Sequence, residues 1–304
     1  MSIKARALVA LIGLASLASA AHAHAFCRST TCRATTATDC ATDPTTKCIT
    51  AGAKLFWPSS CISYAMNELG TDSLDPVATR DTLRKCFQAW TDVTCADGTT
   101  ATMSFQELDP VSCHRSEYNK DGSNVNVVLF QDNDWTYHGI DGTLAKTSVT
   151  YNDATGEIYD ADIEVNAANN EITITDDPAK IQYDLQAIIT HEAGHFIGLA
   201  HTPDPSAVMF ASYAPGTTGQ RTLHPDDIEA ICAVYPANSG KACNTTPRGG
   251  FSGTCAAAAT TTKTVCSVAP GPAPSPYGLA AVVLGAVMTA AGLRRRRWVS
   301  GGTV

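Results

Sequence analysis

Apolar positions recur along residues 54–236 at the spacings of regular helices and strands, over a length in which one compact core is expected. Asp75 and Pro76 open a helical pattern, because an aspartate before a proline is typical of a helix start. A second start lies at residues 224–228, where two aspartates suit the positive end of a helix. The residues expected on the buried faces of these helices are Val77, Leu83, Phe87, Trp90, Ile228, Ile231, Val234 and Tyr235.

Between the two helical patterns the periodicity changes to that of strands. Residues 125–130 form a short β-branched and apolar run, which predicts a buried strand. Residues 147–151 and 157–165 alternate apolar and polar positions around a turn at 152–156, which predicts a hairpin. The domain is therefore expected to contain both helices and strands.

The first 25 residues have the organisation of a signal peptide. Basic Lys4 and Arg6 precede an apolar run, and small residues before Phe26 mark a cleavage site, with a second possible site two residues earlier, after Ala23. We expect residues 1–25 to be removed on export.

A second apolar run lies in residues 277–304 and ends at four arginines, Arg294 to Arg297. It is about 15 residues long, whereas a membrane-spanning helix needs about 20, so it could be a marginal anchor with its arginines inside. The segment more closely resembles a bacterial C-terminal sorting signal of the Myxo type, with Cys266 as the motif cysteine. That resemblance implies a partner system at the membrane that removes the tail or exchanges it for an anchor.

All twelve cysteines follow the predicted cleavage site, and an exported chain with an even cysteine count is expected to form disulfides. Residues 26–53 hold four of them in a Thr- and Ala-rich segment that has too little apolar content for a core without crosslinks. Residues 237–276 have the composition of a linker, in which Cys243 and Cys255 could close a small loop. The connectivity does not follow from the sequence.

The formal net charge is −8, and removal of residues 1–25 and the arginine cluster would leave −14. An acidic chain is repelled by phosphate backbones, so we expect no nucleic-acid partner. The sequence also has no glycine-rich nucleotide-binding loop.

Eleven residues, His191 to His201, carry the candidate chemistry. On a helix, His191 and His195 are four residues apart and project from one face, close enough to share one metal ion. A continued helix would carry His201 away from that face, so the chain must turn back, and Gly198 can adopt the left-handed conformation that ends the helix. Glu192 stands beside the first histidine.

This combination predicts a catalytic zinc site. Three neutral imidazoles around Zn²⁺ leave a fourth position for water, whose pKa falls to about 7. Glu192 would accept a proton from this water as it attacks a peptide carbonyl, and would deliver it to the departing amine. The alternative is a helix with surface histidines, but the glycine and third histidine make the extended spacing far more specific than His-Glu-x-x-His alone.

The eleven residues match the motif of the metzincin zinc endopeptidases at every fixed position, and the segment around Met209 resembles the Met-turn of the matrixins, where a methionine lies beneath the three histidines. The resemblance covers residues 54–236. It implies an α+β, zincin-like catalytic domain: a twisted, mostly parallel sheet with an antiparallel edge strand, an active-site helix, the Met-turn and a C-terminal helix.

The resemblance also implies where a peptide binds. In matrixins the strand before the hairpin turn takes substrate as an extra antiparallel strand, and Leu144 and Ala145 match the family's residues there. Tyr213 matches the tyrosine of the pocket wall after the Met-turn, although Ala211 stands where a proline is usual. Tyr213 could instead pack in the core.

Matrixins hold a second, structural zinc with two histidines on neighbouring hairpin strands, and the sequence places Lys146 and Asp162 at those positions. An ammonium is a poor zinc ligand, so we predict a single zinc, and these two residues could instead form a cross-strand ion pair. The resemblance further implies calcium, for which Asp160 and Glu164 are the candidate ligands.

Two functions fit this sequence. The first is an exported zinc endopeptidase acting on proteins or peptides, and the second is a surface binding or adhesion module that keeps a zinc-stabilised fold without turnover. Glu192 favours the enzyme, because a binding module has no chemical need for a carboxylate there. The Pro-Arg-Cys-Gly latency sequence of matrixins has no counterpart in residues 26–53, so we expect export in an active form or another means of latency.

Overall fold

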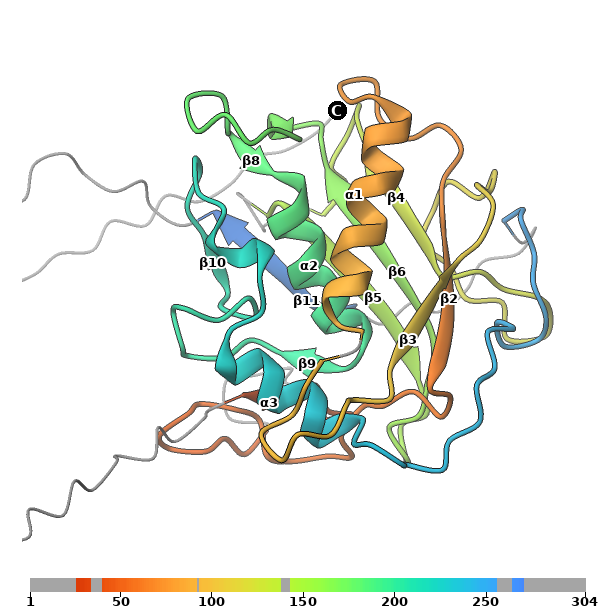
Figure 1. Cartoon of the computed structure of the whole chain (residues 1–304). Coiled ribbons are helices and arrows are strands. Elements are labelled where there is room, and N and C mark those ends of the chain that lie inside the picture. The colour runs from red at the N-terminus through yellow and green to blue at the C-terminus, as the bar shows by residue number, and fades with distance from the viewer. Residues whose placement is uncertain (1–25, 34–39, 92, 138–142, 256–263, 271–304) are drawn as a thin grey trace, which may run out of the picture. The chain divides into compact units, whose positions relative to one another are not determined.

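The strand-forming stretches meet in one mixed sheet, described by a computed structural model of the chain (Figure 1). The described residues are 26–33, 40–91, 93–137, 143–255 and, as backbone, 264–270. The strand order is β10-β11-β5-β6-β4-β2-β3. These strands are β2 (Cys61–Met66), β3 (Ser104–Glu107), β4 (Val127–Gln131), β5 (Ala145–Tyr151), β6 (Ile158–Asn166), β10 (Ser212–Tyr213) and β11 (Thr264–Pro270).

The strand directions agree with the expected fold class. Strands β3, β2, β4 and β6 pair in parallel, whereas β5 runs antiparallel to β6 and forms with it the predicted hairpin. The α+β, mostly parallel architecture is therefore confirmed. One feature was not expected: β11 pairs antiparallel with the other edge of β5, and β10 pairs in parallel with β11.

The helices position the residues of interest against this sheet. Helices α1 (Pro76–Ala89) and α2 (Leu185–Phe196) lie side by side across one face of it, and the core fills the space between (Figure 1). Helix α3 (Pro225–Val234) follows the 3₁₀ turn η1 (Gly219–Arg221). Two short ladders complete the described part, β1 (Cys27–Arg28) with β9 (Leu199–Ala200) and β7 (Ile172–Thr173) with β8 (Tyr183–Asp184).

Helix α1 begins where the sequence predicts, since the Asp75 carboxylate accepts a hydrogen bond from the Ala78 amide at 2.8 Å. The prediction was wrong for Val77, whose side chain is 68% exposed. Leu83 lies six positions after Val77, and at about 100° per residue the two side chains lie on different faces of a helix. The buried face instead includes Thr79 and Thr82, whose hydroxyls donate to backbone carbonyls one turn earlier.

Five disulfides crosslink the described residues, which confirms the expectation of an oxidised chain. Two of them lie within residues 26–53, where the sequence required crosslinks. The pairs are Cys27–Cys48, Cys32–Cys40, Cys61–Cys243, Cys95–Cys232 and Cys113–Cys255.

The expected small loop between Cys243 and Cys255 was wrong. Each of these cysteines pairs with a residue far earlier in the chain, and together they fasten residues 237–255 to the domain. Proximity in sequence does not decide such pairing, because the fold must first bring two Cα atoms within about 7 Å. Within the described residues Cys86 is the free cysteine, and burial raises the pKa of its thiol to about 12, so this thiol is protonated at neutral pH.

Within the described part of the chain, the helices are too short or too polar to cross a membrane. The predicted signal peptide, residues 1–25, and the predicted C-terminal sorting segment, residues 277–304, lie outside the described residues.

Candidate active site

Helix α2 carries the first part of the site, and its N-terminus is held firmly. The Asp184 carboxylate caps the helix by accepting a hydrogen bond from the Ala187 amide at 2.8 Å. The same carboxylate receives two hydrogen bonds from the Arg221 guanidinium, at 2.9 and 2.6 Å. A bidentate pair of this kind fixes the orientation of both groups, so the helix begins at a defined position relative to η1.

The helix ends at the turn that the motif requires. Gly198 has φ +91°, and its amide donates to the His195 carbonyl at 2.9 Å. A Cβ atom at this position would lie 2.7 Å from the Leu55 carbonyl oxygen, so both the dihedral angle and the close approach require glycine. The chain then reverses through β9 and returns His201 to the face of α2.

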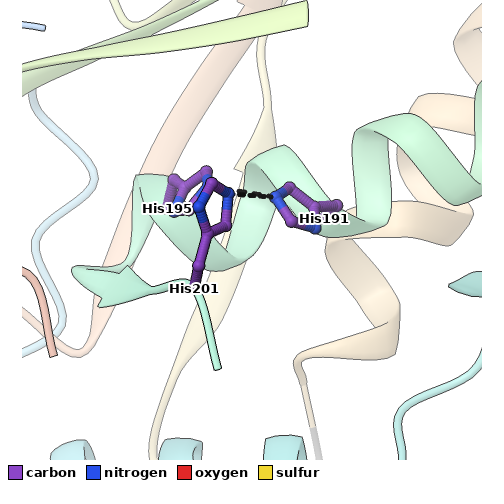
Figure 2. Close-up of side chains that lie close together, drawn as sticks. All are labelled: His191, His195 and His201. Atoms are coloured by element: carbon purple, nitrogen blue, oxygen red, sulfur yellow. Dashed lines mark hydrogen bonds between the residues drawn. The ribbon is translucent and has the colours of Figure 1, made fainter. Parts of the chain in front are cut away.

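Three imidazoles converge on one point. The Nε2 atoms of His191, His195 and His201 lie 3.0 to 3.1 Å from one another, and Figure 2 shows the rings turned toward a common centre. The Nδ1 atoms of His191 and His195 face the carbonyl oxygens of Val208 and Leu199 at 2.6 and 2.9 Å. Because a carbonyl only accepts, both Nδ1 atoms carry the proton and both Nε2 atoms present lone pairs.

Burial keeps this cluster neutral. Desolvation and the neighbouring histidines lower the pKa of His191 and of His195 well below the usual value, and desolvation lowers that of His201 to about 4. Neutral imidazole is the form that binds metals.

The arrangement fits a zinc ion. Lone pairs held about 3 Å apart repel one another unless a cation lies between them, and a point about 2 Å from all three nitrogens matches the Zn–N bond length. Carbonyl partners on Nδ1 are the usual support of histidine ligands. Among the described residues, the only other group of three potential ligands includes Cys113 and Cys255, which are joined in a disulfide.

Glu192 follows His191 on helix α2, and its side chain is held by the sheet. Its side chain is fully buried, and its Oε2 atom accepts a hydrogen bond from the Thr147 hydroxyl at 2.5 Å. Sequence reasoning missed Thr147. The signal available was its place in the hairpin strand two residues after Ala145, but a threonine in a strand is ordinary.

Met209 packs directly against the active-site helix. A Cβ atom on Gly194 would lie 2.1 Å from the Met209 sulfur and 3.0 Å from the Trp90 ring, so the sulfur occupies the space left by the glycine. The Asp227 carboxylate accepts hydrogen bonds from the amides of Val208 and Met209 at 2.8 and 3.1 Å. Sequence reasoning found only a helix N-terminus at Asp227, whereas the carboxylate also fixes the turn that carries Met209.

The residues predicted to bind substrate are buried here. Leu144 and Ala145 are both 0% exposed, and Ala145 lies opposite Val268 of β11. Tyr213 is 1% exposed, and its hydroxyl accepts from the Asp184 amide at 3.2 Å and donates to the Thr217 carbonyl. Tyr213 thus ties β10 to the start of α2, which agrees with the packing alternative.

The predicted ion pair between Lys146 and Asp162 was wrong. In the β5–β6 register Glu164 lies opposite Lys146, and the two side chains pair at 3.6 Å while both are buried. The Lys146 ammonium also stands 3.5 Å from the centre of the Tyr137 ring. The register differs from the sequence assignment by two residues, which keeps a side chain on the same face but changes its cross-strand partner.

The calcium candidates Asp160 and Glu164 have different surroundings. Glu164 accepts hydrogen bonds from the Tyr137 hydroxyl and, at 3.0 Å, from the Gln131 amide, besides its pair with Lys146. Asp160 is buried next to Asp162, and its Oδ1 atom has no hydrogen-bond partner. Calcium binding at Asp160 and Glu164 stays a prediction.

Comparison with known proteins supplies a family. Residues 56–236 match the Matrixin family model. The chain is 25% identical over 189 residues to metalloendoproteinase 1-MMP of Arabidopsis thaliana, covering 60% of this chain and 45% of that protein. It is 26% identical over 209 residues to matrix metalloproteinase-C of Caenorhabditis elegans, covering 64% and 31%. A segment of 57 residues is 44% identical to human neutrophil collagenase, covering 19% and 12%. The chain spans less than half the length of these relatives.

Proposed function

This chain belongs to the matrixin family, and on that premise we propose that it is a zinc-dependent endopeptidase that hydrolyses peptide bonds in proteins. The observation that carries the proposal is the convergence of three imidazole Nε2 atoms within 3.1 Å of one another, with a buried glutamate on the helix that carries His191 and His195. We assign zinc binding to His191, His195 and His201. Zinc held by these nitrogens supplies Lewis acidity toward the peptide carbonyl and the attacking water.

The chain's own residues supply the proton transfers. Glu192 acts as general base, taking a proton from the attacking water at a carboxylate oxygen and passing it to the nitrogen of the departing amine. The Thr147 hydroxyl holds Glu192 Oε2 and thereby fixes the plane of the carboxylate. Val208 and Leu199 hold the Nδ1 protons of His191 and His195, so these rings keep the tautomer that presents Nε2.

The support for Glu192 as general base also weighs against the binding-module alternative. A fully buried carboxylate such as that of Glu192 costs free energy unless it is paired or used. A hydrophobic residue would serve a purely structural zinc site better. The fixed hydrogen bond from Thr147 is what a general base needs and a binding module does not.

We further propose that the protein is exported and acts on protein or peptide substrates outside the reducing cytosol. Five disulfides within the described residues support an oxidising compartment. The C-terminal sorting tail and its membrane partner stay predictions from the sequence.

The test compares the chain from Phe26 to Val304 with its Glu192→Gln variant. We expect the wild type to bind one zinc per chain and to cleave peptides from a mixed library, and a chelator to abolish cleavage. Glu192→Gln keeps the size of the side chain and should keep one zinc while losing at least about a thousandfold in kcat, because the proton acceptor is gone. A folded, zinc-loaded chain that cleaves no peptide even with β11 displaced, as described below, would favour the binding module.

A further inference from the structure

The strand β11 follows the path that matrixin substrates are expected to take. It runs antiparallel to β5, with Val268 opposite Ala145, Ser267 opposite Lys146 and Cys266 opposite Thr147. Ala145 is one of the two residues expected to receive a peptide, and Thr147 is the residue that binds Glu192. The chain's own backbone therefore occupies the edge of β5 beside the general base.

The far end of β11 reaches the segment that follows Met209. Ala269 pairs with Ser212 and Pro270 with Tyr213, both in the parallel direction. Strand β11 thus lies between β5 and β10 and packs against helix α2, which carries His191 and His195 (Figure 1). One stretch of seven residues therefore spans from β5, whose Thr147 binds Glu192, to β10, which follows Met209.

We propose that residues 264–270 are a built-in competitor of the substrate, bound in the substrate's own orientation, so that a peptide binds only to molecules whose β11 has left β5 and activity is lowered through the apparent KM. The proposal rests on the proposed endopeptidase function. The physical reason is exclusion: the edge of a strand offers one row of backbone donors and acceptors, and one added strand uses all of it. A peptide substrate cannot pair with β5 while β11 does.

The covalent connection between β11 and the domain, a tether of residues 256–263, makes such competition effective. The Cys113–Cys255 disulfide fastens the chain to the domain shortly before β11, and residues 256–263 connect the two. Short tethers give effective concentrations on the order of 1 mM. If the dissociation constant of the strand is about ten times lower than this effective concentration, roughly nine-tenths of the molecules hold β11 on β5. The apparent KM for an added peptide then rises about tenfold.

This arrangement differs from latency by a cysteine thiolate on the metal. The competitor uses backbone pairing with β5 and β10 and lies C-terminal to the domain. It gives a means of latency to a chain without a Pro-Arg-Cys-Gly sequence in residues 26–53.

The experiment displaces β11 in the full chain with the double variant Ser267→Pro and Val268→Pro. Successive amides of a strand point to opposite sides, so one of the two prolines removes the donor that faces β5 whichever residue carries it. The matched control is Ser267→Thr with Val268→Ile, which keeps both donors and favours a strand. Zinc content is measured in all three proteins.

Two readouts are compared. Hydrogen exchange of the β5 amides, followed by mass spectrometry, should be fast in the proline variant and slow in the wild type and the control. The KM for a reporter peptide should fall about tenfold in the proline variant with kcat unchanged, and adding the synthetic peptide 264–270 should restore both slow exchange and the higher KM.

The outcomes separate this proposal from the proposed function. Equal exchange rates of the β5 amides in the wild type and the proline variant, or equal KM values where these proteins are active, would overturn the proposal that β11 competes with substrate. Fast exchange of the β5 amides in the proline variant, slowed again by the added peptide, would show that β11 occupies the edge of β5 even if none of the proteins cleaved a substrate. In that case only the proposed endopeptidase function would fail.

Discussion

The hydroxyl of Thr147 donates to the Oε2 atom of Glu192, which joins the central hairpin strand to the proposed general base on α2. The contact makes the position of the carboxylate depend on the sheet rather than on the helix alone. General bases act well only when they are held within hydrogen-bond reach of the proton they take.

Replacing Thr147 by valine removes this hydrogen bond and nearly conserves volume. We expect kcat to fall about 10- to 100-fold, the equivalent of a lost hydrogen bond to a charged group, with KM and zinc content unchanged. The measurement is steady-state kinetics with β11 displaced, so that latency does not mask the effect. Thr147→Ser keeps the hydroxyl and should retain most of the activity. Equal kcat in both variants would show that the contact has no part in catalysis.

Gly194→Ala should destabilise the Met-turn. The new Cβ atom would lie 2.1 Å from the Met209 sulfur, so the methionine side chain must shift from its place against the active-site helix. We expect a loss of about 1–3 kcal/mol in the free energy of unfolding, measured by denaturant titration, and weaker zinc binding. Met209→Ala makes room for the added methyl group, so the double variant should lose less than the sum of the two single changes. Simple additivity would mean that the two side chains do not compete for this space.

Lys146→Met leaves Glu164 without its cation in a buried position. Breaking a buried pair costs about 3–5 kcal/mol, and we expect a loss of that order in thermal or chemical unfolding. Adding Glu164→Gln removes the unpaired buried charge and should recover much of the lost free energy of unfolding. Gln131 and Tyr137 keep a hydrogen-bond partner in the new amide. Zinc should stay at one per chain throughout. A loss of zinc in Lys146→Met would show that this cluster supports the metal.

Asp160→Asn should change how stability depends on pH. Burial raises the pKa of Asp160 well above 3.8 and that of Asp162 to about 8, and Glu117 and Glu164 add further negative charge. The folded state therefore binds more protons than the unfolded state between about pH 4 and pH 8, so these carboxyls contribute stability that is present below pH 4 and lost as pH rises through 8.

Replacing one carboxyl by an amide should accordingly raise the unfolding temperature more at pH 8 than at pH 5. The comparison is made by calorimetry with and without added calcium. If calcium stabilises the wild type at pH 8 and not Asp160→Asn, the predicted calcium site at Asp160 gains direct support. A wild-type unfolding temperature that does not vary with pH would contradict the shared burial of these carboxyls.

The sequence by itself determined the features that depend on neighbouring residues. Helix α1, the β5–β6 hairpin and the start of α3 follow from local periodicity and from residues that favour helix ends or turns. The candidate metal ligands fall within eleven consecutive residues, because one helical turn and one glycine reversal suffice to bring three imidazoles together. Chemistry encoded over so short a distance needs little from the rest of the fold.

Only the tertiary structure decided the contacts made across long distances in the chain. The register of β5 against β6 gave Lys146 its partner, which a sequence offset of two residues had misassigned. The partners of Cys243 and Cys255 depend on where the whole chain passes. Thr147 and Asp227 acquire their roles only through elements that approach from elsewhere.

The pairing of residues 264–270 with β5 is another contact that only the tertiary structure decided, because the two strands lie far apart in the sequence. In the sequence the segment lies within a predicted linker and contains Cys266 of the proposed sorting signal, but its pattern did not predict a strand. Its place follows from backbone hydrogen bonding to an available strand edge, which almost any extended segment can provide. The tether and the fold select the segment that binds, so the sequence determined the candidate chemistry and the tertiary structure decided what covers it.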